Sequence, residues 1–254
     1  MKKYFLITLL FLAALFIASC TKKNNLAPVP TGHLYFHLHT DIDSFEVGAY
    51  NSVIQTTNGR NISLGLAQMY ISNIELVKLD GSIYPVTNKV ILKHFETEAY
   101  LIGNVPAGNY KSIHFSVGLS AAENAKTPVA NDTVFYHPEM WFGNTIQPVG
   151  YIFLNVQGKI DTTALANGTK VQMVPFSYKI GTIANSRQVI MPDQNFTVLP
   201  DQDDYEHIII NYMRIFDGVD LSKARNLSVQ NTADNSNVLA IQISNNIPNM
   251  FHYE

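Results

Sequence analysis

Three histidines and a tyrosine alternate near the start of the chain in a pattern that could bind a metal ion. His33, Tyr35, His37 and His39 occupy every second position, so on a β-strand their side chains lie on one face. Two histidines two residues apart on a strand can reach one ion, and imidazole suits copper, zinc or nickel. His37 and His39 are therefore candidate metal ligands. The alternative left open is that the apolar residues between them are buried and the histidines simply face water.

A second candidate lies in the segment 137–143, which contains the chain's one tryptophan, Trp141, directly after Met140. Methionine sulfur and histidine nitrogen are ligands that favour copper, whereas a Met–Trp pair also serves as hydrophobic packing. Spacing alone leaves both interpretations open. We expect the other histidines to be structural or superficial, namely His94, His114, His207 and His252.

Motifs for other chemistries are missing from the sequence. It contains no phosphate-binding glycine loop, no Gly-x-Ser-x-Gly elbow and no His-Glu-x-x-His zinc helix. The acidic segment 201–204 lacks the glycine and the distal glutamate of a calcium loop and indicates a solvated turn. We therefore expect a non-enzymatic protein. A hydrolase stays as an alternative only because scattered carboxylates could meet in the folded chain.

The N-terminal segment predicts export and lipid anchoring. Lys2 and Lys3 precede an apolar run over residues 4–17, and Ala18-Ser19-Cys20 follows. This layout is typical of a bacterial lipoprotein signal peptide (residues 1–19), after which the Cys20 thiol is acylated. An ordinary secretory signal with a chance cysteine is the alternative. We expect an envelope protein held by its lipid in the membrane, in the outer membrane facing the periplasm.

Composition restricts the partners. Cys20 is the single cysteine, so once it is lipidated neither a disulfide nor a thiolate ligand can form. Removal of the signal leaves 15 Lys and Arg against 20 Asp and Glu, a net charge of about −5. Nucleic acid needs a basic face and is therefore not an expected partner.

The sequence predicts that the elements that carry these residues are β-strands. Residues 20–31 are polar and contain two prolines, which predicts an extended linker. Beyond it, apolar and polar residues alternate with period two, and Asp80-Gly81 is a hairpin signal. We predict an all-β fold, a single antiparallel β-sandwich over residues 32–254, with short helical segments near 121–124 and 218–224. The expected strands are 34–39, 68–79, 111–117, 151–156, 174–180 and 207–212.

Several sequence blocks follow one another in a recognisable order. They are 69–76 before Asp80-Gly81, the run Val-Pro-Ala-Gly-Asn-Tyr-Lys-Ser-Ile-His-Phe-Ser-Val-Gly at 105–118, Met140-Trp141 leading to 150–153, and Phe-Ser-Tyr-Lys-Ile-Gly at 176–181. Together, over roughly residues 32–221, they resemble the MbnP-like family, the methanobactin-associated copper-binding proteins.

The resemblance implies a periplasmic β-sandwich that handles copper. In copper-binding members, histidines and a tryptophan oxidised to kynurenine by a partner dihaem peroxidase form the site. Carried over, the tryptophan falls at Trp141 beside Met140, and an early-strand histidine falls near His37 or His39. The family histidine of the Phe-x-Tyr-His-Ile-Gly block is Lys179 here, and one tryptophan stands where the family usually has two. A protonated lysine offers no lone pair to a metal.

Two functional hypotheses follow. The first is a non-catalytic, lipid-anchored protein that captures or stores copper, with His37, His39, Met140 and Trp141 as ligands. The second is a metal-free β-sandwich that serves as a binding or scaffold module for a surface partner or glycan. The first predicts that His37 or His39 lies within ligand reach of the Met140–Trp141 loop and that Lys179 points elsewhere. A lysine that fills the space between them would contradict it.

Overall fold

The computed structural model describes residues 28–254 except 96, 144–149 and 164–172. The predicted signal peptide, the lipidation site at Cys20 and most of the linker lie outside the described residues and stay predictions. Within the described part of the chain, no helix is long and apolar enough to cross a membrane.

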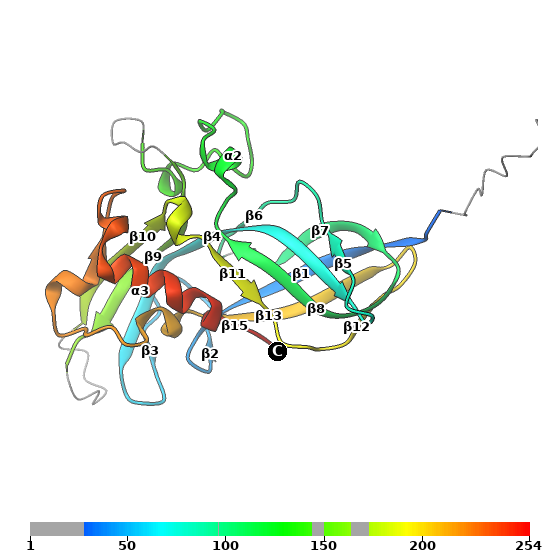
Figure 1. The fold of residues 1–254 in the computed structure, drawn as a ribbon. Coiled ribbons are helices and arrows are strands. Elements are labelled where there is room, and N and C mark those ends of the chain that lie inside the picture. Colours follow the sequence, from blue (N-terminus) through cyan, green and yellow to red (C-terminus); the bar gives the residue numbers. More distant parts are fainter. Residues whose placement is uncertain (1–27, 96, 144–149, 164–172) are drawn as a thin grey trace, which may run out of the picture.

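The chain forms mostly strands, with a few short helices beyond residue 120 (Figure 1). The strands are β1 (31–42), β2 (45–46), β3 (54–55), β4 (61–78), β5 (83–85), β6 (91–93), β7 (99–106), β8 (108–117), β9 (152–161), β10 (173–181), β11 (187–190), β12 (196–198), β13 (203–211), β14 (228–229) and β15 (251–253). The helices are α2 (121–124) and α3 (238–246), with 3-10 turns η1 (138–140), η2 (183–185), η3 (212–216), η4 (224–227), η5 (234–236) and η6 (247–250).

The first sheet, sheet A, is built around β1. β7 and β2 pair with one edge of β1, and β13 pairs with the other edge and carries β15 on its far side. β1 and β13 run parallel, whereas the other pairs in this sheet are antiparallel. A parallel pair cannot be joined by a tight turn, and here most of the chain, including the second sheet except β14, lies between the two strands. The all-β prediction is confirmed, but the prediction of purely antiparallel sheets is wrong.

The second sheet, sheet B, is built around the long strand β4. β8 and β9 flank it, β10 follows β9, and β11 and β12 extend the sheet beyond β8. The predicted hairpin is present, because β4 turns back into β5 with Gly81 at a φ of +85°, a conformation that suits glycine. One parallel pair, β10 with β14, occurs here as well.

Alternation along the strands builds the main core between the two sheets. Leu34, Phe36 and Leu38 of β1 are fully buried there, as are Met69 and Ile71 of β4. The residues between them must face the opposite sides of their sheets, since successive side chains on a strand alternate. The two outer faces of the sandwich are therefore where polar side chains can gather.

A smaller apolar cluster covers the outer face of sheet B. Its buried members are Tyr70, Leu92, Leu119, Met140, Tyr151 and Phe153. Tyr70 lies between two main-core residues of β4, so it projects to the other side of the sheet. The loop that contains α2 and η1 supplies much of the cover.

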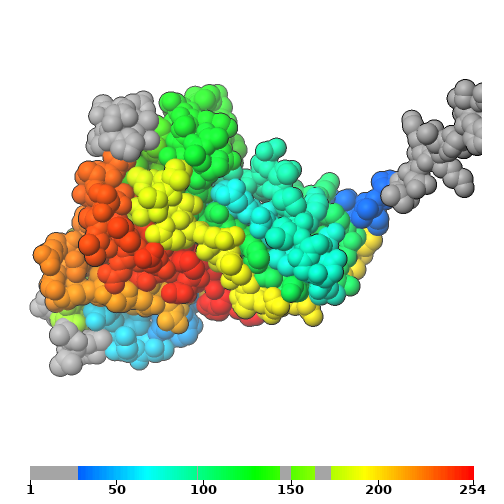
Figure 2. Space-filling model, in the orientation of Figure 1, coloured from blue at the N-terminus to red at the C-terminus, as the bar shows by residue number. Residues whose placement is uncertain are grey.

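Two short α-helices, α2 and α3, complete the fold. α2 forms where a short helix was predicted, and Ser120 and Glu123 make its capping box. α3 was not predicted; the Asn237 side chain caps it by accepting the Ala240 N–H. The segments from η4 to α3 lie at the end of the molecule away from residues 28–31 (Figures 1 and 2), whereas β15 pairs with β13 nearer the middle.

Candidate metal centre

β1 presents its histidines on the outer face of sheet A. His33, Tyr35, His37 and His39 are partly exposed, while the apolar residues between them fill the core. The expected shared face is thus present, and the alternative that the intervening residues are buried is also correct. The two interpretations do not conflict, because an outer sheet face can still hold a metal ligand.

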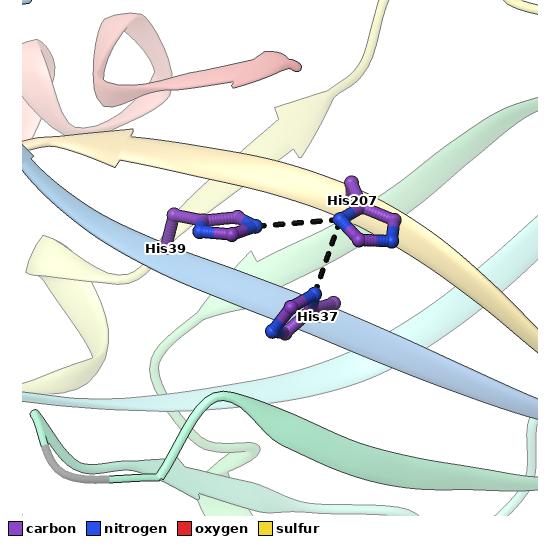
Figure 3. Close-up of side chains that lie close together, drawn as sticks. All are labelled: His37, His39 and His207. Carbon is purple, nitrogen blue, oxygen red and sulfur yellow. Dashed lines mark hydrogen bonds between the residues drawn. The ribbon is translucent and has the colours of Figure 1, made fainter. Parts of the chain in front are cut away.

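A third histidine joins them from β13. In the parallel register His37 lies directly opposite His207. The Nδ1 atoms of these two rings are 3.1 Å apart, and His39 Nε2 is 3.3 Å from the same His207 nitrogen (Figure 3). One ligand atom from each ring lies within 4.8 Å of the others. We call His37, His39 and His207 the three-histidine centre.

His207 is expected from the sequence to be structural or superficial, and it does lie at the surface. It is a half-exposed strand residue, but it meets two other histidines. Within the strand 203–211 nothing distinguishes it from a histidine facing water. The signal that could have found it is the parallel pairing with β1, which no local pattern contains.

Two carboxylates face the outer ring nitrogens of the centre. Glu98, just before β7, places Oε2 3.1 Å from His37 Nε2. Glu46 of β2 places Oε1 3.5 Å from His39 Nδ1. A carboxylate on the far nitrogen fixes the tautomer and leaves the other nitrogen with its lone pair for a metal.

A third carboxylate faces the interior of the centre. Glu254 follows β15, and its Oε2 is 3.0 Å from His207 Nδ1 and 3.6 Å from His39 Nε2. These are the same two nitrogen atoms that face each other. The side chain is 57% exposed, so this side of the centre is open to solvent.

One nitrogen of the centre has more neighbours than hydrogen bonding can serve. His207 Nδ1 lies within 3.3 Å of His37 Nδ1, His39 Nε2 and Glu254 Oε2. A ring nitrogen carries either one proton or one lone pair, so it can make one good hydrogen bond. A cation among the four atoms would give every lone pair a partner.

The surroundings are negative. Asp41, at the end of β1, is largely buried and pairs with Glu46 across the strands. Burial, and then the negative charge of Glu46, raise the pKa of the Asp41 carboxyl above its usual value. Carboxylates crowded in this way favour a nearby cation, because each interaction with it is attractive.

Met140 and Trp141 lie elsewhere. Met140 is fully buried in the apolar cluster on sheet B, and the Trp141 ring packs on Tyr151 at a centroid distance of 4.8 Å. The main core separates this face from His37 and His39. The structure therefore brings together the two predicted histidines but not the predicted four-residue site.

A histidine pair does accompany the Met140–Trp141 loop. The rings of His94 and His137 are 5.0 Å apart, and His137 shares a small apolar pocket of about 180 Å³ with Trp141. The amide of Gln68 faces His94 Nδ1 at 3.1 Å. Both nitrogens of His137 face oxygen atoms: Nδ1 is 3.3 Å from Glu139 Oε1, and Nε2 is 3.1 Å from the Thr133 carbonyl oxygen.

Lys179 belongs to this second region. On β10 it lies between two main-core residues, so it faces outward from sheet B, and it pairs with Asn155, which in turn pairs with Gln68. The lysine therefore stands in the same cross-strand row as His94 and not beside the three-histidine centre. It does not fill a space between His37 or His39 and Met140–Trp141, because those residues share none.

Comparison with known proteins agrees with this fold. The family model of MbnP matches residues 31–237. The chain belongs to the MbnP family. MbnP from Methylosinus trichosporium has a similar solved structure, with a TM-score of 0.50 and 17% identity over 76% of this chain and 80% of that chain. At this identity the likeness shows the fold alone. No curated protein sequence matches this chain significantly.

Family membership confirms the resemblance drawn from the sequence blocks. It also makes the position of Lys179 informative, because this MbnP-family chain carries a lysine on the face where its Met–Trp loop lies. The donor set there is one methionine buried in apolar packing, a tryptophan and two hydrogen-bonded histidines. The donor set on sheet A, three imidazoles of which two are oriented by carboxylates, fits a copper ion better.

Proposed function

We propose that this protein is an exported, lipid-anchored copper-binding protein that captures or stores the metal at the bacterial cell envelope without catalysing a reaction. The observation that carries the proposal is the convergence of His37, His39 and His207 on one point. The anchor rests on the sequence around Cys20, and the choice of copper rests on family membership together with the imidazole donors.

The spacing of the nitrogens supports a metal and not only a hydrogen-bond network. With metal–nitrogen bonds of about 2.0–2.1 Å, tetrahedral ligands are roughly 3.3–3.4 Å apart. Two of the three nitrogen–nitrogen distances of the centre are 3.1 and 3.3 Å, and all three lie within 4.8 Å. The rings thus need little movement to bind an ion.

The outer carboxylates support the same reading. Glu98 and Glu46 occupy the far nitrogens of His37 and His39. That arrangement orients a histidine and raises its basicity as a ligand. On sheet B, by contrast, both ring nitrogens of His137 face oxygen atoms, and the Gln68 amide faces Nδ1 of His94.

The test is retention of copper by the purified protein. Wild type would be loaded with Cu(I) and Cu(II) separately, dialysed against a weak chelator and measured by elemental analysis. We expect about one copper per chain, as the single three-histidine centre predicts, and its loss in His37→Ala and His207→Ala. His33→Ala is the matched control, since His33 lies on the same face of β1 but pairs with Asp203 at 2.8 Å.

Two results would contradict the proposal. If wild type retained no copper, the metal-free scaffold module would be the better reading. If the triple variant His37→Ala/His39→Ala/His207→Ala retained as much copper as wild type, the ion would be bound elsewhere. His94→Ala and His137→Ala would then show whether the Met140–Trp141 face holds it.

A further inference from the structure

We infer that Glu254 is a fourth ligand of the three-histidine centre and that its carboxylate makes the site selective for a divalent ion, Cu(II) or Zn(II), over Cu(I). This rests on the proposed function, because it concerns the ligand set of that same centre. Glu254 lies in no sequence motif and was not a candidate from the sequence.

Glu254 differs from the other two glutamates in which atoms it faces. Glu46 and Glu98 face ring nitrogens on the outside of the centre, at 3.5 and 3.1 Å. Glu254 Oε2 faces His207 Nδ1 and His39 Nε2, at 3.0 and 3.6 Å. These two nitrogens also converge on each other, so the carboxylate oxygen is a fourth corner of the same group of atoms.

The corner distances fit a four-coordinate ion. Tetrahedral ligands at about 2.0–2.1 Å from a metal are roughly 3.3–3.4 Å apart. Four of the six edges are 3.0 and 3.6 Å from Glu254 and 3.1 and 3.3 Å between the histidines, and the three histidine nitrogens all lie within 4.8 Å of one another. Small movements of the exposed Glu254 side chain would bring its two distances to the histidine nitrogens close to the tetrahedral value.

The backbone holds Glu254 at this place. β15 pairs antiparallel with β13, and the Glu254 N–H donates to the His207 carbonyl at 3.3 Å. The glutamate is therefore anchored to the strand that carries one of the histidines. Its side chain has enough exposure to swing aside and let an ion enter from solvent.

The donor type decides the selectivity. Three neutral imidazoles accept either oxidation state of copper, whereas soft sulfur donors favour Cu(I) and a carboxylate favours harder divalent ions. The sulfur of Met140 is buried in the other region and is not available here. The negative charge of Glu254, added to those of Glu46 and Glu98, stabilises a doubly charged ion more than a singly charged one.

The experiment compares Glu254→Gln with wild type by chelator competition for Cu(II), Zn(II) and Cu(I), and by the electron paramagnetic resonance spectrum of the Cu(II) form. Removing a direct ligand should cost at least the roughly 10- to 100-fold that loss of an outer partner costs. We therefore expect Cu(II) and Zn(II) affinities to fall by tenfold or more and the Cu(I) affinity to fall by a clearly smaller factor. The Cu(II) spectrum should also change.

Glu46→Gln is the matched control. It removes the same charge at nearly the same place, but Glu46 faces only the outer nitrogen of His39. We expect a weaker site with the wild-type Cu(II) spectrum. The contrast separates a direct ligand from a nearby negative charge.

Three results would overturn the inference, and they can be told apart. An unchanged Cu(II) affinity and spectrum in Glu254→Gln, with His207→Ala inactive in binding, would remove Glu254 from the ligand set and leave the proposed function standing. Equal losses for Cu(I) and Cu(II) would refute the selectivity. A wild-type protein that binds no ion at all would refute the proposed function, and this inference with it.

Discussion

The two outer faces of the sandwich carry similar residues in opposite arrangements. On sheet A, Glu98 and Glu46 take the outer nitrogens of His37 and His39, so the inner nitrogens converge. On sheet B, His137 meets oxygen acceptors at both of its nitrogens, and Lys179 stands in the neighbouring row. Proximity of histidines is therefore not sufficient for a metal site; what decides is which nitrogen each partner leaves free.

The largest effect on this comparison of the two faces is expected at Met140. We expect its side chain to contribute packing and not to bind the metal. Met140→Ala should lower the free energy of unfolding by about 2–5 kcal/mol, because it opens a cavity among fully buried side chains. Urea unfolding measures this. Met140→Leu keeps the volume and should cost less than about 1.5 kcal/mol. A stable Met140→Leu protein that had lost its copper would show that the sulfur is a ligand after all.

The next effect concerns the outer carboxylate of sheet A. Glu98→Gln should lower copper affinity by roughly 10- to 100-fold without changing the stoichiometry, since the ring of His37 loses its orienting partner. Chelator competition measures the affinity. Glu75→Gln is a suitable control, because Glu75 lies beside His114 on sheet B. An affinity equal to wild type would mean that the oriented-nitrogen argument fails.

A smaller effect is expected at Lys93 of β6, which lies in the sequence next to His94 of the sheet B face and shortly before Glu98 of the sheet A face. It is fully buried, its Nζ donates to the His94 carbonyl, and burial lowers its pKa to about 8. Between pH 8 and its ordinary value near 10.5, the unfolded chain binds more protons than the folded chain, so stability should rise with pH.

The rise should be roughly 1.5 kcal/mol between pH 8 and 9.5, within the limit of about 1.4 kcal/mol per pH unit set by linkage. The quantity to measure is the difference in unfolding free energy between wild type and Lys93→Met at each pH, in which other titrating groups cancel. A difference that stayed constant over this range would show that the folded chain keeps Lys93 charged.

The smallest effect is expected at Lys179. Lys179→His restores the residue type of the family block on the sheet B face, yet we expect stability to change by no more than about 0.5 kcal/mol, as for a partly exposed position. Copper stoichiometry should also stay at the wild-type value, because both nitrogens of His137 and Nδ1 of His94 keep their present partners. Elemental analysis decides this, and a second retained copper would reveal a latent site on sheet B.

The local elements could be read from the sequence because their signals are local. Alternation along 34–39 predicted which side chains face out, and Asp80-Gly81 predicted a hairpin that the structure contains. Helix α3 had a readable signal that was missed, since Asn237 precedes apolar residues at helical spacing and caps the helix. Membership of the MbnP family was also readable, from ordered blocks of residues.

The third histidine could not be read in the same way. His37 and His207 are 170 residues apart, and their contact depends on the parallel pairing of β1 with β13. Which strand pairs with β1 is determined by the packing of the whole sandwich. The same holds for Glu254, which reaches the centre only because β15 pairs with β13. The expected link from His37 or His39 to Met140 and Trp141 failed because sequence order did not show that they lie on different sheets.

The parallel pairing of β1 with β13 also sets when the protein can hold an ion. An extended chain offers only isolated histidines, and the full set of ligands appears after the first and one of the last long strands have met. Ion binding then stabilises the folded state by mass action and holds β1 and β13 together. A chain that is translocated unfolded would therefore travel empty, and would load its ion only in the compartment where it folds.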